Sequence, residues 1–226
     1  MAESQRDDRS SRPLTLYVDA FYISPYAFSC FVTLREKGLA FEVCPVPLQD
    51  KAQKEPGYRD RSLTARVPAL VHGDFWLSES SAIDEYLEEV FPPPAYAAVY
   101  PRDARERARA RQVQAWLRSD LMALREERAT TTMFYARAEQ PLSAAGAAAA
   151  ETLIRVAEQS LGAGGSYLCD AWSIADADLA FMLQRLIRNG DPVPARLRDY
   201  AEREWQRPAA REWVERERIP LVPYES

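Results

Sequence analysis

Three consecutive prolines, Pro92–Pro94, divide the sequence into two stretches with different patterns. Before them, short β-prone runs alternate with helix-like segments, whereas after them the apolar residues recur with helical periodicity. Proline ends helices and has no N–H for a sheet ladder, so the triplet predicts a boundary between two folding units. With 226 residues, the chain is long enough for two small hydrophobic cores. We therefore expect two domains of different class.

The first stretch predicts an α/β domain. Four β-prone runs are expected to form strands: residues 14–18, 41–46, 67–71 and 75–77. A helix is expected between the first two strands, a hairpin from the last two, and another helix after Ser78. Residues 49–64 are expected to form an irregular connection with at most a short helix. The order βαβ followed by ββα is that of a thioredoxin-like sheet with helices on both faces.

The second stretch predicts an all-helical domain. Its helical segments are expected at residues 103 to about 128, 144–161, 174–187, 194–204 and 208–217. The domains are accordingly placed at residues 13–94 and 101–220. The polar residues 1–12 are expected to be a disordered tail.

Charge and cysteine content exclude several classes of protein. A net charge of −5 argues against nucleic-acid binding, which needs many cations facing phosphates. The arginines between 102 and 111 could form a phosphate-binding face, but interleaved acids favour an ordinary solvated helix surface. Three widely spaced cysteines without a C-x-x-C pair indicate neither a disulfide framework nor a zinc site, so no metal is expected. Without a secretory signal or a long apolar run, a soluble cytoplasmic protein is expected, with no membrane partner.

Three short motifs in the first stretch could bind a ligand, and each also has a structural explanation. Val67-Pro68 could expose the backbone of Val67 at a sheet edge, or could be an ordinary turn. Glu79 and Ser80 stand where a helix begins, so its N–H groups and Ser80 suit a carboxylate while Glu79 suits an ammonium group. The alternative is a plain helix cap with Ser78 at the N-cap. Ser24, before Pro25, could cap a helix or favour ionisation of a bound thiol.

Taken together, these motifs resemble those of a known family. SPY at residues 24–26, VP at 67–68 and ESSAI-x-x-YL from Glu79 look like the glutathione site of a cytosolic glutathione S-transferase of the serine or cysteine branch. The segment WSIADAD from Trp172 resembles the family's helix-starting capping box, in which Ser173 and Asp176 have a structural role. The stretches LSESSAI-x-EYLE and RARQ-x-QAWLRSDLM look like the bacterial YfcF-type subgroup.

The resemblance implies a role for each matching residue. The backbone at Val67-Pro68 would pair with the cysteinyl part of glutathione, the co-substrate, and Glu79 and Ser80 would hold its γ-glutamyl end. Ser24 would stabilise the glutathione thiolate as the catalytic residue, with Tyr22 as the alternative. An electrophile pocket between the domains is expected to include Tyr26, Trp116, Ser119 and Met122.

The resemblance also implies an enzyme, although another class of function stays open. The expected activity is transfer of glutathione to small electrophiles or glutathione-dependent reduction of organic peroxides, in detoxification or oxidative stress, by a homodimer. Dehalogenase and isomerase activities share the same first domain. The alternative is a non-catalytic interaction module of the same fold. Such modules usually lose the activating residue and the Glu-Ser pair, whereas Ser24, Glu79 and Ser80 are all present here.

Overall fold

The computed structural model describes residues 12–162 and 164–222. The chain divides into two compact units: unit 1 is Met1–Val99 with Glu215–Ser226, and unit 2 is Tyr100–Val214. The disordered tail expected at residues 1–12 lies outside the described residues, apart from Arg12. The domain boundaries at 13–94 and 101–220 stay predictions.

Unit 1 contains a four-stranded sheet in the order β2-β1-β3-β4. The strands are β1 (Leu14–Asp19), β2 (Glu42–Val46), β3 (Ala69–His72) and β4 (Phe75–Ser78). β1 runs parallel to β2 and antiparallel to β3, and β3 runs antiparallel to β4. Pro45 lies in β2, an edge strand, where a residue without an N–H is tolerated. This mixed sheet confirms the predicted α/β class of the first stretch.

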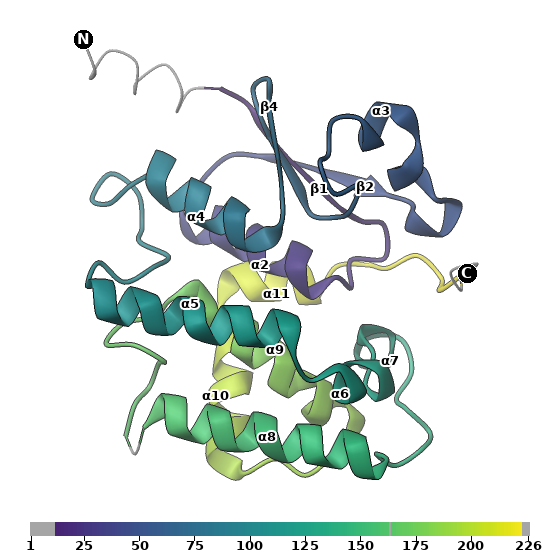
Figure 1. The fold of residues 1–226 in the computed structure, drawn as a ribbon, viewed down its shortest axis with the longest axis vertical. Helices are drawn as coiled ribbons and strands as arrows, with labels where there is room; N and C mark the ends of the chain where they lie inside the picture. Colours follow the sequence, from purple (N-terminus) through teal and green to yellow (C-terminus); the bar gives the residue numbers. More distant parts are fainter. Residues whose placement is uncertain (1–11, 163, 223–226) are drawn as a thin grey trace. The chain divides into compact units, whose positions relative to one another are not determined.

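Two helices cover one face of the sheet (Figure 1). They are α2 (Pro25–Glu36) and α4 (Ser80–Val90). Because side chains alternate along a strand, Leu16 and Val18 of β1 are fully buried on this face. The buried carboxylate of Asp84 in α4 accepts hydrogen bonds from Ser29, at 2.9 Å, and Thr33, at 2.8 Å, both in α2. These polar contacts fix α4 against α2 inside an otherwise apolar layer.

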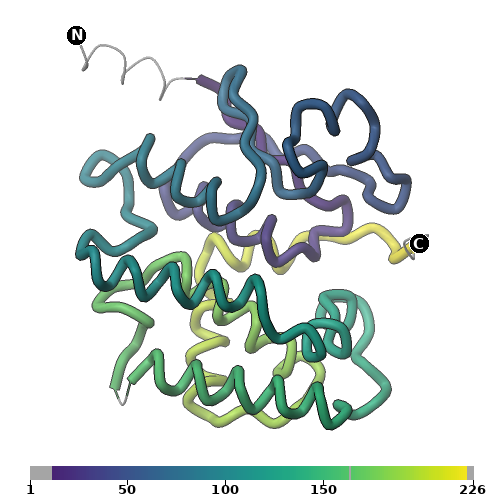
Figure 2. The backbone as a smooth tube through the Cα atoms, viewed as in Figure 1, coloured from purple at the N-terminus to yellow at the C-terminus, as the bar shows by residue number. Residues whose placement is uncertain are grey.

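The connection between β2 and β3 packs on the opposite face. It contains the 3₁₀ turns Leu48–Asp50 and Ala52–Lys54 and the short helix α3 (Pro56–Arg59), which Figure 2 shows as a series of tight turns. The ring of Tyr58 contacts Tyr17 of β1 edge-on, with centroids 5.5 Å apart, and Trp76 of β4 at 6.0 Å. The prediction of an irregular connection with at most a short helix is confirmed, and helices lie on both faces of the sheet.

Unit 2 is helical throughout its secondary structure, as predicted. Its helices are α5 (Ala104–Ser119), α6 (Met122–Glu127), α7 (Thr130–Phe134), α8 (Ala144–Leu161), α9 (Ile174–Asn189), α10 (Ala195–Trp205) and α11 (Pro208–Val214). α9 is buried on almost all sides because α5, α7, α8 and α10 pack around it. A helical core, rather than a second sheet, therefore organises this unit.

The single helix predicted from residue 103 to about 128 is wrong. It breaks after Ser119, and Leu121 adopts a left-handed conformation with φ 63° while its side chain stays buried. Asp120 stabilises the break because its carboxylate accepts hydrogen bonds from the Leu121 N–H, at 2.6 Å, and from Trp116 Nε1, at 3.0 Å. An acid that bonds nearby N–H groups offers the backbone an alternative to the helix.

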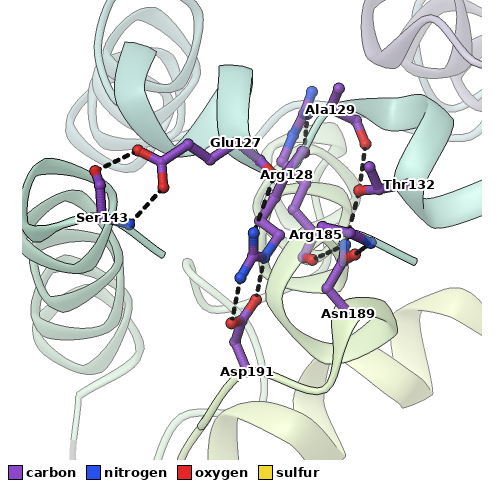
Figure 3. A network of polar contacts seen from close by, with 9 residues as sticks. Glu127, Arg128, Ala129, Thr132, Ser143, Arg185, Asn189 and Asp191 are labelled. Atoms are coloured by element: carbon purple, nitrogen blue, oxygen red, sulfur yellow. Dashed lines mark hydrogen bonds and ion pairs between the residues drawn. The ribbon is translucent and has the colours of Figure 1, made fainter. Parts of the chain in front are cut away.

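A buried polar network joins the turn after α6 to the end of α9 (Figure 3). The guanidinium of Arg128 donates to both carboxylate oxygens of Asp191, at 2.6 and 2.9 Å. Arg185 donates to the carbonyl oxygen of Arg128 at 2.7 Å, and Asn189 donates to the hydroxyl of Thr132 at 2.9 Å. The network thus holds α7, a helix that the periodicity did not predict, against α9.

The capping box at the start of α9 is present. The carboxylate of Asp176 accepts hydrogen bonds from the Ser173 N–H at 2.9 Å, from the Leu168 N–H at 2.8 Å and from the Tyr200 hydroxyl at 3.0 Å. Burial raises the pKa of Asp176, and the hydrogen bonds from Leu168 and Ser173 lower it in part. A single carboxylate therefore connects α9 to the loop before it and to α10.

Candidate functional site

Strand register brings the three predicted glutathione-site motifs of unit 1 to one edge of its sheet. β1 pairs with β3 from Leu14↔His72 to Tyr17↔Ala69, so the end of β1 lies beside the start of β3. β3 pairs with β4 so that Ala69 faces Ser78, which places the end of β4 at the same edge. Ser24 follows β1, Val67-Pro68 precedes β3, and Glu79-Ser80 follows β4. Residues far apart in the sequence thus share one edge.

Ser24 is the N-cap of α2. Its hydroxyl oxygen accepts a hydrogen bond from the Ala27 N–H at 3.2 Å, and Pro25 occupies the first turn. The cap interpretation is therefore correct. It does not exclude the catalytic one, because accepting this bond uses a lone pair and leaves the hydroxyl proton to donate.

Asp19 orders the loop that carries Ser24, a role that was not predicted from the sequence. Its carboxylate, 1% exposed, accepts hydrogen bonds from the N–H groups of Ile23, at 2.8 Å, and Ser24, at 3.0 Å. Burial raises the pKa of Asp19, and these two backbone hydrogen bonds oppose the rise. The available signal was an acid at the end of a β-prone run, in the turn-like segment DAFYISP.

Tyr22, the alternative catalytic residue, lies in the same loop with φ 52°. Its carbonyl oxygen accepts a hydrogen bond from Arg218 at 3.2 Å, and the guanidinium of Arg216 lies 4.9 Å from the centre of its ring. Both arginines come from the segment that follows α11 and belongs to unit 1. The C-terminal segment therefore contacts the loop that carries both catalytic candidates.

The Val67–Pro68 peptide bond is cis. Pro68 is buried and Val67 is half-buried, two residues before the first residue of β3. Just upstream, the hydroxyl of Tyr58 donates to the carbonyl oxygen of Arg66 at 2.6 Å. The backbone around Val67 is thus held from the α3 side.

Glu79, not Ser78, is the N-cap of α4, which corrects the structural alternative given for this motif. Ser78 belongs to β4, and its hydroxyl lies 3.0 Å from that of Ser62. Glu79 has an exposed side chain, a positive φ of 71° and no side-chain cap bond, so its carboxylate does not serve the helix. Ser80 is the first helical residue and is buried, and its carbonyl oxygen lies 3.7 Å from Cys30 Sγ in α2.

The residues expected in the electrophile pocket lie in both units. Tyr26 is in α2 of unit 1, whereas the other three lie around the α5–α6 break of unit 2. There, Trp116 donates to Asp120, Ser119 donates to the carbonyl oxygen of Ala115 at 3.0 Å, and Met122 is 53% exposed. A pocket that joins all four residues stays a prediction.

Two features are absent from the described part of the chain. No helix among residues 12–162 and 164–222 is long and apolar enough to cross a membrane. Over the same ranges, no group of His, Cys, Asp and Glu side chains has the arrangement of a metal site. The three cysteines, Cys30, Cys44 and Cys169, all lie in the described residues and form no disulfide there.

Comparison with known families gives matches in both units. Residues 103–217, just over half of the chain, match the family model "Glutathione S-transferase, C-terminal domain", and residues 23–90 match "Glutathione S-transferase, N-terminal domain". Among curated proteins, glutathione S-transferase 3 of Zea mays is 41% identical over 75 residues, 33% of each chain. The match thus spans about a third of the length of this plant relative.

Solved structures extend the similarity to nearly the whole chain. A glutathione transferase homolog from Burkholderia GL BGR1, solved with bound glutathione, is 46% identical with a TM-score of 0.75, covering 90% of this chain and 97% of that one. A glutathione S-transferase from Rhodospirillum rubrum F11 has a TM-score of 0.72 at 24% identity, covering 93% and 96%, and supports the fold alone.

Proposed function

This chain belongs to the glutathione S-transferase family, and from this premise we propose that it binds glutathione at the sheet edge formed by the ends of β1 and β4 and the start of β3. The observation that carries the proposal is the strand register, which brings Ser24, Val67-Pro68 and Glu79-Ser80 to that edge. The 46% identical homolog, which was solved with glutathione bound, supports the choice of ligand.

Different groups of the protein would recognise the cysteinyl part of glutathione and its γ-glutamyl end. The backbone of Val67 would pair with the cysteinyl part of the peptide, as an extended ligand pairs with a sheet edge. The first N–H groups of α4 and the Ser80 hydroxyl would bind the γ-glutamyl carboxylate, because a helix N-terminus attracts anions. The exposed carboxylate of Glu79 would pair with the ammonium group.

Ser24 would act on the thiol. Its hydroxyl would donate a hydrogen bond to the glutathione sulfur, and the N-terminus of α2 would add a positive dipole. Both effects stabilise the thiolate over the thiol, so more glutathione would be ionised at neutral pH. The thiolate would then attack an electrophilic carbon and expel the leaving group. With a peroxide, the sulfur would attack oxygen, and a second glutathione would complete the reduction to alcohol, water and glutathione disulfide.

The finer assignments are part of the same proposal. Tyr26, Trp116, Ser119 and Met122 would line the pocket for the electrophile or the organic peroxide. The protein would be a cytoplasmic homodimer of the serine or cysteine branch, similar to the YfcF-type subgroup, and would serve in detoxification or oxidative stress. Domains at residues 13–94 and 101–220 would carry the glutathione site and most of the electrophile pocket, respectively.

Calorimetric titration of glutathione into the wild type and into Glu79→Ala/Ser80→Ala tests the site. We expect the wild type to bind and the double variant to lose at least about tenfold in affinity, because two charge-assisted contacts are removed. Glu89→Ala is the matched control, since it removes an exposed acid near the other end of α4 and should leave affinity unchanged. Equal affinity of the double variant and the wild type would place the ligand elsewhere.

The same titration separates the enzyme from the interaction module. If the wild type binds glutathione, turnover with model electrophiles and with organic peroxides then distinguishes conjugation from peroxide reduction. A folded wild type that binds no glutathione would contradict the enzyme proposal. It would leave the non-catalytic module as the explanation for the fold.

A further inference from the structure

Two segments of the proposed glutathione site are each held by a hydrogen bond one residue upstream. Arg66, just before Val67, is held through its carbonyl oxygen by the Tyr58 hydroxyl at 2.6 Å. Ser78, just before Glu79, has its hydroxyl 3.0 Å from that of Ser62. Tyr58 and Ser62 lie earlier in the same connection between β2 and β3 that ends with Val67-Pro68, and neither residue is among the proposed ligand contacts.

Tyr58 and Ser62 are also bonded to each other. The Ser62 N–H donates to the Tyr58 carbonyl oxygen at 2.8 Å, which closes one helical turn at the end of α3. The two anchoring hydrogen bonds, Tyr58–Arg66 and Ser62–Ser78, therefore involve residues of the same helical turn.

The residues that form the two anchoring hydrogen bonds are buried. Ser62 is 1% exposed and Ser78 7% exposed, and the Tyr58 ring is held between Tyr17 and Trp76. Burial raises the pKa of Tyr58 to about 12, so its hydroxyl stays a proton donor at neutral pH. A buried hydrogen-bond network of this kind keeps one arrangement, because any other leaves polar groups unsatisfied.

We propose that Tyr58 and Ser62 are positioning residues that fix the spacing between the Val67 backbone and the Glu79-Ser80 helix start. The inference rests on the proposed glutathione site, because the spacing matters only if one ligand spans both segments. Through this spacing the two hydroxyls act on how well glutathione fits. They carry no charge and lie outside the loop of Ser24, so they do not set the ionisation of the thiol.

The test compares Tyr58→Phe and Ser62→Ala with Tyr17→Phe. Tyr17 is the matched control because it belongs to the same aromatic cluster, stacked on Trp76 at 5.1 Å, and neither of the two anchoring hydrogen bonds involves it. For each variant we would measure the KM for glutathione, kcat at saturating glutathione, and the pKa of the bound thiol by its ultraviolet absorbance. Unfolding in urea would show whether each variant is folded.

We expect Tyr58→Phe and Ser62→Ala each to raise the KM for glutathione about fivefold, since each removes one of the two neutral anchoring hydrogen bonds. In both variants kcat and the thiol pKa should stay at the wild-type values, and Tyr17→Phe should change none of the three. The double variant Tyr58→Phe/Ser62→Ala should raise KM by less than the product of the single effects, because the residues act as one unit.

Three results would overturn the inference. One is an unchanged KM in Tyr58→Phe and Ser62→Ala while the wild type binds glutathione. Another is an equal rise in the KM for glutathione in Tyr17→Phe, which would attribute the effect to loosening of the aromatic cluster. The third is a shift of kcat and thiol pKa without a change in KM. A wild type that binds no glutathione would instead overturn the proposed function, and this inference with it.

Discussion

Ser24 caps α2 and, under the proposal, also stabilises the thiolate, so one substitution removes both effects together. Ser24→Ala deletes the N-cap of α2 and, under the proposal, the donor to the thiolate. We expect a loss of about 1 kcal/mol in the free energy of unfolding, a rise in the pKa of bound glutathione and a lower kcat, with glutathione affinity nearly unchanged. Stability follows from urea unfolding, and the pKa from the absorbance of the thiolate.

A second cap separates the two effects. Ser143 caps α8 in unit 2 in the same way, accepting from the Gly146 N–H at 3.1 Å, so Ser143→Ala should lower stability without changing the thiol pKa. Tyr22→Phe removes the competing hydroxyl. If Tyr22→Phe raises the thiol pKa and Ser24→Ala does not, Tyr22 is the residue that assists the thiolate.

At the residue scale, local patterns predicted caps but not backbone conformation. Ser24 before Pro25, and Ser173 three residues before Asp176, are standard start signals and cap their helices in the structure. Glu79 gave no such signal. Its φ of 71° is set by the junction between β4 and α4, a conformation that residues with side chains adopt only when their surroundings enforce it. The sequence therefore suggested Ser78 as the cap.

At the element scale, the position of most helices and strands could be predicted, but the helix break could not. The segment 144–161 is alanine-rich and begins at a serine cap, and it forms α8 over the same residues. Residues 103–128 have continuous helical periodicity, which does not reveal that Asp120 bonds the Leu121 N–H. A single side-chain contact decided that break, and periodicity averages over many residues.

The polar network of Figure 3 gives a prediction at this scale. The side chains of Arg128 and Asp191 are 4% and 13% exposed, so removing either leaves a buried charge without its main partner. We expect Arg128→Ala to lower the free energy of unfolding by about 3 to 5 kcal/mol. Asp191→Ala should cost a similar amount, and the double variant clearly less than the sum. Urea unfolding of the four proteins gives the coupling energy.

An exposed ion pair in the same unit provides the control. Arg109 pairs with Glu106 at 2.8 Å on α5, but the arginine side chain is 70% exposed. The corresponding cycle of alanine variants should give a coupling below about 1 kcal/mol, because water screens the pair. Similar coupling energies in the two cycles would show that the Arg128–Asp191 pair does not hold α7 against α9.

At the scale of the whole molecule, the sequence predicted two folding units from its change of pattern at the prolines. It did not predict that the segment after α11 returns to unit 1. Arg216 and Arg218 contact Tyr22 there, almost two hundred positions away in the sequence. Arginines in a polar C-terminal segment give no periodic signal, and a contact at such separation depends on how the chain folds.

Buried carboxyl groups in both units predict how stability depends on pH. Burial raises the pKa of Asp19 in unit 1 and of Asp176 and Glu204 in unit 2. A raised pKa means that the folded state takes up protons before the unfolded state does. Stability from these groups therefore increases as the pH falls from neutral toward the ordinary values of 3.8 and 4.5.

One described carboxyl group acts in the opposite direction, but in another pH range. Hydrogen bonds from Ser143 lower the pKa of the half-buried Glu127, so the stability that Glu127 contributes is lost only as the pH falls below the ordinary value of 4.5. Between about pH 7 and about pH 5 the three buried carboxyl groups outweigh Glu127 and act to raise the urea midpoint. Trp76, the only tryptophan of unit 1, and the four tryptophans of unit 2 give fluorescence signals for the two units. A midpoint that falls over this range would show that the buried carboxyl groups ionise at no cost to the fold.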